Sequence, residues 1–318
     1  MDTSELEYAL PPELIAQRPL ETRDASRLLV VDRATGTIRH RRFTDLPAEL
    51  AADAVVVVND TRVVPARLRV QRPGGGAAEL LLLERRNGHG LWEALARPSR
   101  RLRPGARLSG AAQVELLEPL GGGRWLIRLD GEPHGEVPLP PYIVAELDDP
   151  ERYQTVYASE AGSAAAPTAG LHFTPELLAR LPAVEHVTLH VGLDTFRPLT
   201  STTVEEHRIH GERYRVEPEA WERIRAARTV VAVGTTTARV LETLAGGGPL
   251  TGRTELYITP GFTFRRVDCL VTNFHLPRTS LLALVMAFAG IDTAREIYRE
   301  AIAERYRFYS FGDAMLVL

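Results

Sequence analysis

The feature that most constrains the fold of this 318-residue chain is a change of pattern that begins near residue 66 and ends near residue 150. Short alternating or apolar runs in this stretch, such as Glu79–Glu84 and Arg124–Leu129, are separated by glycine-rich turns, such as Gly74–Gly76 and Gly121–Gly123. Short strands at this spacing are typical of a small antiparallel β-barrel. We therefore expect residues 66–150 to form a separate β-barrel domain.

Buried-strand patterns lie on both sides of that stretch. Val55–Val58 and Val230–Val233 are continuous apolar runs, which indicate strands covered on both faces of a sheet. After residue 150, further strand patterns, including Glu255–Ile258, alternate with helix patterns. This order predicts an α/β domain with a mixed or mostly parallel sheet. We expect residues 1–65 and 151–318 to form this one discontinuous domain, with the small antiparallel barrel inserted into it.

Composition excludes several classes of protein. The 38 basic residues are all arginine, which excludes a lysine Schiff base and a P-loop lysine. The net charge of −3 excludes a polycation that binds nucleic acid or membranes by bulk charge. The single cysteine, Cys269, excludes a disulfide within the chain.

The first residues are acidic, and the longest apolar run, Leu281–Ile291, is far shorter than the ~20 residues of a membrane span. We therefore expect a soluble, cytoplasmic protein.

Polar side chains recur where the expected strands end, which is where α/β sheets place their sites. Asp60 and Arg62 follow the first buried strand and could orient a hydroxyl or a phosphate. His172 lies with Thr168 and Gly170 in a loop of small residues that leads into a helix N-terminus. Such a terminus favours an anion or a hydroxyl.

Later strands are followed by similar clusters. His190 and Arg197 come after one of them. Thr235, Thr236 and Arg239 occupy a strand–turn–helix segment, whose hydroxyls could hold a ribose or a phosphate. The segment lacks the G-x-G-x-x-G spacing of a dinucleotide-binding fold.

Four more polar residues complete the candidate set. Asn273 can read a base edge or an amide, and His275 can transfer protons. His210 and Glu212 are potential metal ligands with no third ligand nearby, which is a weak zinc pattern, and we predict no metal site. Each cluster also has a structural alternative: a turn with a surface ion pair, a core histidine, a solvated charged face or a threonine helix cap. Their recurrence after successive strands favours an enzyme active site.

Taken together, these segments resemble one family over nearly the whole chain, the S-adenosylmethionine:tRNA ribosyltransferase-isomerases of queuosine biosynthesis. The blocks that carry the resemblance follow one another in order: Tyr8–Pro12, Ile15–Pro19, Val58–Leu68, Pro138–Ile143, Tyr153–Tyr157, Ala165–Phe173, His190–Gly192, Ala232–Thr236, Thr272–Pro277 and Glu304–Met315.

The resemblance implies an α/β domain with an inserted β-barrel, and an activity. The family transfers and isomerises the ribosyl part of S-adenosylmethionine onto a 7-aminomethyl-7-deazaguanine at the wobble position of tRNA. Epoxyqueuosine-tRNA forms, and adenine and methionine leave. The expected partners are therefore that tRNA and S-adenosylmethionine as co-substrate, with no bound cofactor and no metal. We expect a monomer.

This chemistry needs a base that removes a proton from the ribose carbon beside the sulfonium. The titratable candidates are His172, His190, His210 and His275, of which we take His172, His190 and His275 as catalytic candidates. Asp60, Glu212 or Phe173 could face the sulfonium. We rank His172 ahead of His190, because its loop can admit substrate and the following helix can help lower its pKa.

One crevice is expected to collect most of these residues, because each follows a strand or opens a helix. The residues expected to converge are Asp60, Arg62, His172, His190, Arg197, Thr235 and Asn273. The remaining residues expected to bind substrate are Thr168, Gly170, His210, Glu212, Thr236 and Arg239.

Arginine must contact the tRNA phosphates, because the chain has no lysine. The barrel candidates are Arg97, Arg100, Arg101 and Arg103. A second candidate cluster is Arg39, Arg41 and Arg42. The alternative for each cluster is a solvated arginine-rich face.

One departure from the family pattern keeps other functions open. Asp194 stands where the family has glycine in its His-Val-Gly-x-Gly-Thr motif. A related enzyme that acts on another adenosyl or ribosyl substrate is the first alternative. A non-catalytic RNA-binding protein is the second, and it would leave the histidines far from one another and from any cavity.

Overall fold

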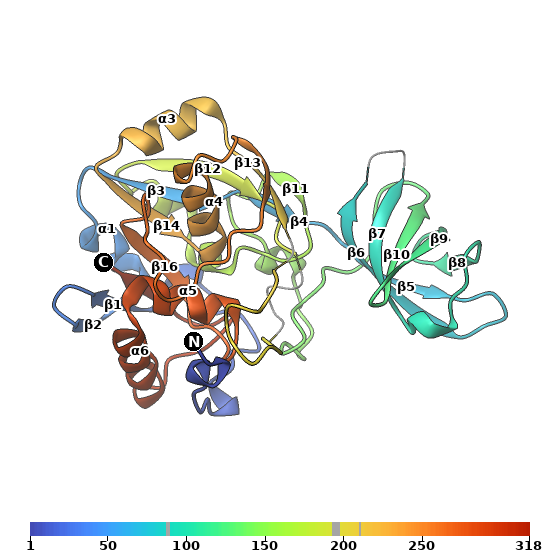
Figure 1. Ribbon diagram of the computed structural model, residues 1–318, viewed down its shortest axis with the longest axis horizontal. Helices are drawn as coiled ribbons and strands as arrows, with labels where there is room; N and C mark the ends of the chain where they lie inside the picture. The colour runs from blue at the N-terminus through green and yellow to red at the C-terminus, as the bar shows by residue number, and fades with distance from the viewer. Residues whose placement is uncertain (87–89, 193–197, 210) are drawn as a thin grey trace.

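The protein is described by a computed structural model that covers residues 1–86, 90–192, 198–209 and 211–318. The β-barrel stands to one side of a larger α/β body, and extended segments join the two (Figure 1). The barrel strands fall between β3 and β12 in the sequence, and β3 and β12 both belong to the sheet of the α/β body. The boundaries at 65/66 and 150/151 stay a prediction.

In the described part of the chain, the large sheet has nine strands in the order β15-β13-β12-β3-β14-β16-β17-β1-β2. Their bounds are β1 (Arg27–Asp32), β2 (Thr37–Arg42), β3 (Ala54–Asn59), β12 (Val184–Leu189), β13 (Glu212–Arg215), β14 (Thr229–Val233), β15 (Thr251–Thr254), β16 (Cys269–Asn273) and β17 (Ala314–Val317). A separate pair joins β4 (Thr61–Val63) to β11 (Glu160–Ser163).

The centre of the large sheet is parallel, and its edges are antiparallel. Strands β12, β3, β14 and β16 run parallel to one another, whereas β17 is antiparallel to β16, and β13 is antiparallel to β12. Val55–Val58 and Val230–Val233 lie in adjacent strands of this sheet. The expected fold class, a mixed sheet with an additional antiparallel barrel, is confirmed.

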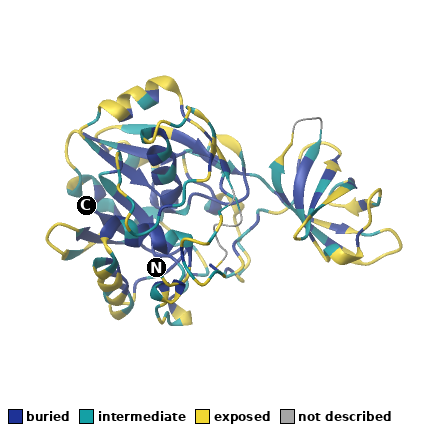
Figure 2. Ribbon diagram, in the orientation of Figure 1, coloured by how far each residue is buried: buried dark blue, intermediate teal, exposed yellow. Residues whose placement is uncertain are grey.

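Helices cover both faces of the sheet, as the continuous valine runs predict. Side chains alternate along a strand, so Val57 packs on one face while Val56 and Val58 pack on the other. One face carries α3 (Pro218–Ala226), α4 (Thr235–Ala245), α5 (Ser280–Ala289) and α6 (Ile291–Ala303), and the other carries α1 (Leu46–Glu49) and α2 (Pro175–Leu178). The central strands are dark blue in Figure 2 because they are buried.

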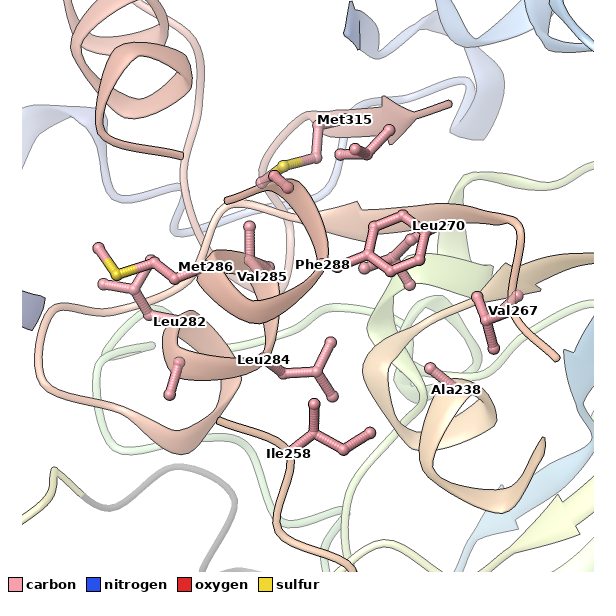
Figure 3. Close-up of a cluster of buried hydrophobic side chains, with 14 of the residues drawn as sticks. Ala238, Ile258, Val267, Leu270, Leu282, Leu284, Val285, Met286, Phe288 and Met315 are labelled. Carbon is pink, nitrogen blue, oxygen red and sulfur yellow. The ribbon is translucent and has the colours of Figure 1, made fainter. Parts of the chain in front are cut away.

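Helix α5 is apolar around most of its circumference, because it is buried between the sheet and its neighbours. Figure 3 shows Leu282, Leu284 and Phe288 of this helix in the same cluster as Ile258 and Leu270. Thr279 caps the helix by accepting a hydrogen bond from the N–H of Leu282, which satisfies one donor of its first turn.

The barrel closes in the order β10-β7-β6-β5-β8-β9 through antiparallel pairs. The bounds of its strands are β5 (Arg67–Gln71), β6 (Ala77–Arg85), β7 (Leu91–Arg97), β8 (Arg107–Gly110), β9 (Val114–Gly121) and β10 (Arg124–Leu129). Its interior is an apolar core of its own that includes Trp92 and Trp125.

The expected strand at Glu255–Ile258 is wrong, because the strand lies earlier, at β15. Side chains form hydrogen bonds with the main-chain groups that follow β15. Arg239 donates from Nε to the Leu256 carbonyl oxygen (2.9 Å), and the Thr254 hydroxyl accepts from the Leu256 N–H (3.2 Å). These groups are then unavailable to a neighbouring strand.

No helix in the described part of the chain combines the length and the hydropathy that a membrane span requires.

Glu242 of α4 provides a test of how this helix is anchored. Its buried carboxylate accepts hydrogen bonds from the N–H groups of Arg265, Arg266 and Val267 at 2.8–2.9 Å. We expect Glu242→Ala to lower the free energy of unfolding by about 3 kcal/mol, because buried donors without an acceptor each cost ~1–3 kcal/mol. Urea denaturation followed by circular dichroism measures the change.

The matched control is Glu296→Ala, which removes an exposed carboxylate from α6. It should change the free energy of unfolding by less than ~0.5 kcal/mol. Equal losses in the two variants would contradict the anchoring role of Glu242.

Candidate active site

A cavity of about 360 Å³ is lined by residues of both the barrel and the α/β domain. The barrel supplies residues of β6, β7 and β10, among them Glu84, Glu93 and Arg124. The α/β domain supplies the residues after β12, the start of α4 and the start of α5. Small-molecule sites commonly have volumes of ~300–1,000 Å³, so this cavity can enclose a ligand.

Ion pairs connect the two domains at the edge of the cavity. Glu84 of β6 lies 2.7 Å from Arg253 Nη1 and 3.2 Å from Arg213 Nε, and both arginines belong to the α/β domain. Glu93 of β7 is buried and pairs with Arg86 and Arg124. The barrel wall of the cavity therefore carries two carboxylates that are held by arginines.

His190, one residue beyond β12, lines the cavity. Its Nδ1 lies 2.9 Å from the Thr61 hydroxyl, and its Nε2 forms no hydrogen bond within the described part of the chain. Burial lowers the pKa of His190, and the charge of Arg213 lowers it further. The imidazole is therefore neutral at pH 7 and can accept a proton.

Gly162 of β11 lies directly against the His190 ring. A Cβ atom on this glycine would stand 2.8 Å from Cε1 of the imidazole, and its φ of +150° is one that other residues rarely adopt. The close approach of backbone to ring, together with the Thr61 contact, fixes the plane of the imidazole.

Glu212 and Arg239 form a buried ion pair in the cavity wall. Glu212 also accepts a hydrogen bond from the Gly192 N–H at 2.8 Å, and Arg239 donates to the carbonyl oxygens of Thr254 and Leu256. The ion pair therefore connects the segment after β12, through Gly192, to the segment after β15, through Leu256. It places the Glu212 carboxylate beside the cavity.

Thr235 and Thr236 open α4 and line the cavity. Gly234, with φ +91°, makes the turn from β14 into this helix, a conformation that favours glycine. The helix N-terminus and the two hydroxyls can therefore face a polar ligand, as the sequence predicted for a ribose.

His172 does not share this cavity. Its Nδ1 lies 2.8 Å from the Ser26 hydroxyl, its Nε2 lies 3.3 Å from Asn273 Nδ2, and its ring packs on Phe43. It lines a separate hollow of about 20 Å³. Burial lowers its pKa to about 3, with Arg307 and Arg23 adding to the shift.

Several other candidates also lie away from the cavity. His275 is buried, its Nε2 lies 2.8 Å from the Thr272 hydroxyl, and burial lowers its pKa to about 3. Asp60 accepts from the Thr188 hydroxyl at 2.7 Å, and burial raises its pKa. Arg62 pairs with Glu151.

The small-residue loop packs inside the protein. A Cβ atom on Gly170 would stand 2.0 Å from the Tyr157 hydroxyl oxygen, so this glycine allows close packing. Thr168 begins the same 3-10 turn and is half-buried. Neither residue lines the large cavity.

The expected convergence is therefore wrong as a whole. Of the seven residues, the structure brings His190 and Thr235 to the large cavity and His172 to the small hollow. Asn273 is hydrogen-bonded to His172. Arg197 lies outside the described residues, as do His210 and Asp194. In the remainder of the chain, no group of three or more histidine, cysteine, aspartate or glutamate side chains is placed to hold a metal ion.

The barrel arginines lie elsewhere on the barrel. Arg97, Arg100, Arg101 and Arg103 are exposed, and none of them forms an ion pair within the described ranges. In contrast, Arg39 and Arg41 of the second cluster both pair with Glu49. The four barrel arginines are thus the cluster whose charges are available to a partner.

Sequence reasoning missed the barrel side of the cavity. In the sequence, nothing distinguishes Glu84, Glu93 and Arg124 from other charged residues of the strands. The sequence does not show which wall of the barrel faces the α/β domain. Arg213, Arg253 and Tyr257 were missed for a similar reason, since they come from edge strands and from the segment after β15.

The sequence matches the family model described as "Queuosine biosynthesis protein" over residues 3–317. It is 54% identical over 329 residues to S-adenosylmethionine:tRNA ribosyltransferase-isomerase of Rubrobacter xylanophilus, with 100% of this chain and 98% of the relative covered. It is 50% identical over 342 residues to the protein of the same name from Desulfitobacterium hafniense, with 100% of both covered. A crystal structure of S-adenosylmethionine tRNA ribosyltransferase from Thermotoga maritima is 40% identical with a TM-score of 0.58, over 99% of this chain and 100% of that one. The chain belongs to the queuosine biosynthesis protein family.

Proposed function

We propose that this protein is an S-adenosylmethionine:tRNA ribosyltransferase-isomerase. The observation that carries the proposal is the similarity to proteins of that name along the entire chain. The cavity between barrel and α/β domain supports it, because it combines a neutral histidine, hydroxyls at a helix N-terminus and carboxylates. The non-catalytic alternative is not favoured, since His190 lines a cavity.

The finer proposal names the acceptor and the products. The ribosyl group is transferred to a 7-aminomethyl-7-deazaguanine at the wobble position of tRNA. A base removes a proton from the ribose 5′-carbon beside the sulfonium, and adenine leaves. The amine of the acceptor base then attacks, and an epoxide closes as methionine leaves. The product is epoxyqueuosine-tRNA.

His190 is the base in this proposal. A general base must be neutral before it acts and must face the reacting atom. Among the described residues, Nε2 of His190 forms no hydrogen bond, while Nδ1 is held by Thr61. His172 is less suited, because both of its ring nitrogens have protein partners and its hollow is far smaller than the substrate. The geometry therefore favours the reverse of the order that the sequence suggested.

The other walls of the cavity match other parts of the substrate. A positive sulfonium is stabilised by nearby carboxylates, and Glu84, Glu93 and Glu212 are the candidates. Thr235 and Thr236 could donate to ribose oxygens. The exposed arginines of the barrel, Arg97, Arg100, Arg101 and Arg103, would contact tRNA phosphates. A monomeric state and a cytoplasmic location are further parts of this proposal.

Replacement of each histidine separates the two candidate bases. We expect His190→Ala to lower turnover about 100-fold or more, because general bases contribute ~10²–10⁴-fold. His172→Ala should lower turnover far less, after correction for any loss of folded protein. The measurement is the release of adenine and methionine from S-adenosylmethionine with precursor-bearing tRNA. Full activity of His190→Ala would exclude it as the base.

The pH dependence of turnover reports the protonation of His190. Because its pKa is lowered below the ordinary value of ~6.5, kcat/KM should stay constant down to about pH 6.5 and fall below it. Arg213→Gln removes a positive charge that lowers this pKa, so the acid limb should move to higher pH. Arg215→Gln, a change in the same strand, is the matched control and should leave the limb in place. A limb that does not move in Arg213→Gln would contradict the assignment.

The barrel arginines can be tested through the salt dependence of tRNA binding. Arg101→Ala combined with Arg103→Ala should weaken tRNA binding and leave S-adenosylmethionine binding unchanged. Each lost phosphate contact should lower the slope of log K against log salt by about 0.7–0.9. An unchanged slope would show that both residues belong to a solvated face.

A further inference from the structure

Three arginines surround the small hollow in which His172 lies. The hollow is lined by Arg23, Arg152 and Arg307, together with Ser26 and Ser310. All three arginines are half-buried, and they come from distant parts of the chain. None of the three lines the large cavity, which has a different lining.

These guanidinium groups have no carboxylate partner within the described ranges. Most other arginines of the surface form ion pairs, for example Arg62 with Glu151. The three guanidinium groups instead donate to main-chain carbonyl oxygens: Arg23 to Leu171 (3.2 Å) and Glu151 (2.9 Å), Arg152 to Leu20 (2.5 Å) and Glu21 (3.1 Å), and Arg307 to Arg18.

The acidic groups nearby are committed to other donors. Asp149 accepts from the N–H of Glu151, and the Glu151 carboxylate pairs with Arg62. Asp313 accepts from the N–H groups of Arg27 and Arg307. The positive charge around the hollow is therefore not neutralised by a direct ion pair.

Burial acts against the charges of Arg23 and Arg307, and repulsion from Arg152 also acts against the charge of Arg23. Burial lowers the pKa of Arg23, and the charge of Arg152 lowers it further. Burial also lowers the pKa of Arg307. In addition, Arg152 Nε and Arg307 Nη1 are buried and have no hydrogen-bond acceptor among the residues that the structure describes. An anion at the hollow would relieve the repulsion, because it attracts all three charges at once.

We propose that Arg23, Arg152 and Arg307 form a binding site for a phosphate group. Guanidinium groups bind phosphate oxygens through paired N–H donors. A hollow of about 20 Å³ has room for roughly one water-sized group, so it admits phosphate oxygens from the surface and not a whole nucleotide. The source of the phosphate is the tRNA backbone, an assignment that rests on the proposed function.

Inorganic phosphate is the first probe, used on the full-length protein at constant ionic strength. Amide resonances of Ser310–Gly312 should shift and saturate with phosphate in the wild type. Arg152→Gln should raise the Kd at least tenfold, and Arg152→Lys should raise it less, because lysine keeps the charge. Arg299→Gln removes an exposed arginine of α6 and should leave the Kd unchanged.

If Arg152→Gln fails to fold, as circular dichroism would reveal, Arg23→Gln replaces it. A saturable shift in the wild type that either variant weakens supports the phosphate site. Absence of a saturable shift in the folded wild type overturns it. This arm requires no catalytic activity, so its result stands even if the proposed function fails.

The second probe is tRNA, which identifies the source of the phosphate. In Arg152→Gln the salt slope of tRNA binding should fall by about 0.7–0.9, as expected for one lost phosphate contact, while Arg299→Gln keeps the wild-type slope. If phosphate binding is lost but the tRNA slope stays the same, the site binds a free phosphorylated compound. That outcome overturns the tRNA assignment and keeps the site.

Discussion

The side chain of Asn59 holds together the two strand ends on which the candidate site depends. Asn59 is the last residue of β3, and it is buried. Its amide donates to the Leu189 carbonyl oxygen (3.0 Å), and its Oδ1 accepts from the N–H groups of Leu189 (3.0 Å) and Thr61 (3.2 Å). Thr61 is itself bonded to this amide, and His190 directly follows Leu189, so this one amide sets the distance between the catalytic candidate and the hydroxyl that orients it. No apolar residue of the same size could make these bonds.

The barrel supplies the remaining wall of the cavity. The α/β domain supplies the histidine, the helix N-terminus and the Glu212–Arg239 pair. The barrel supplies Glu84 and Glu93, and Glu93 pairs there with Arg86 and Arg124. A buried ion pair contributes little to stability when desolvation is counted, but it fixes the position of its charges. The carboxylates around the cavity can therefore face a cationic substrate without moving when it binds. An inserted domain is suited to this role, because both ends of the insertion are tied to the α/β domain.

The fold could be predicted from the sequence because it depends on local patterns. The valine runs indicate buried strands, the glycine-rich turns indicate the barrel, and both are visible along the chain.

The site could be predicted only in part. Residues such as Thr235 and His190 follow strands of the parallel centre and do reach the cavity. His172 lies in a loop of small residues before a helix, yet its ring nitrogens form hydrogen bonds with Ser26 and Asn273. Hydrogen bonds between distant segments decide which histidine lines the cavity, and periodicity carries no information on them.

In the proposed function, S-adenosylmethionine binds between the two domains with its ribose beside His190. The most direct test is a crystal structure of the full-length protein with S-adenosylmethionine bound. We expect the ribose 5′-carbon to face Nε2 of His190, with the ribose oxygens near Thr235 and Thr236 and a carboxylate of the cavity beside the sulfonium. A ligand bound at His172, Ser26 and Asn273 instead would contradict this account.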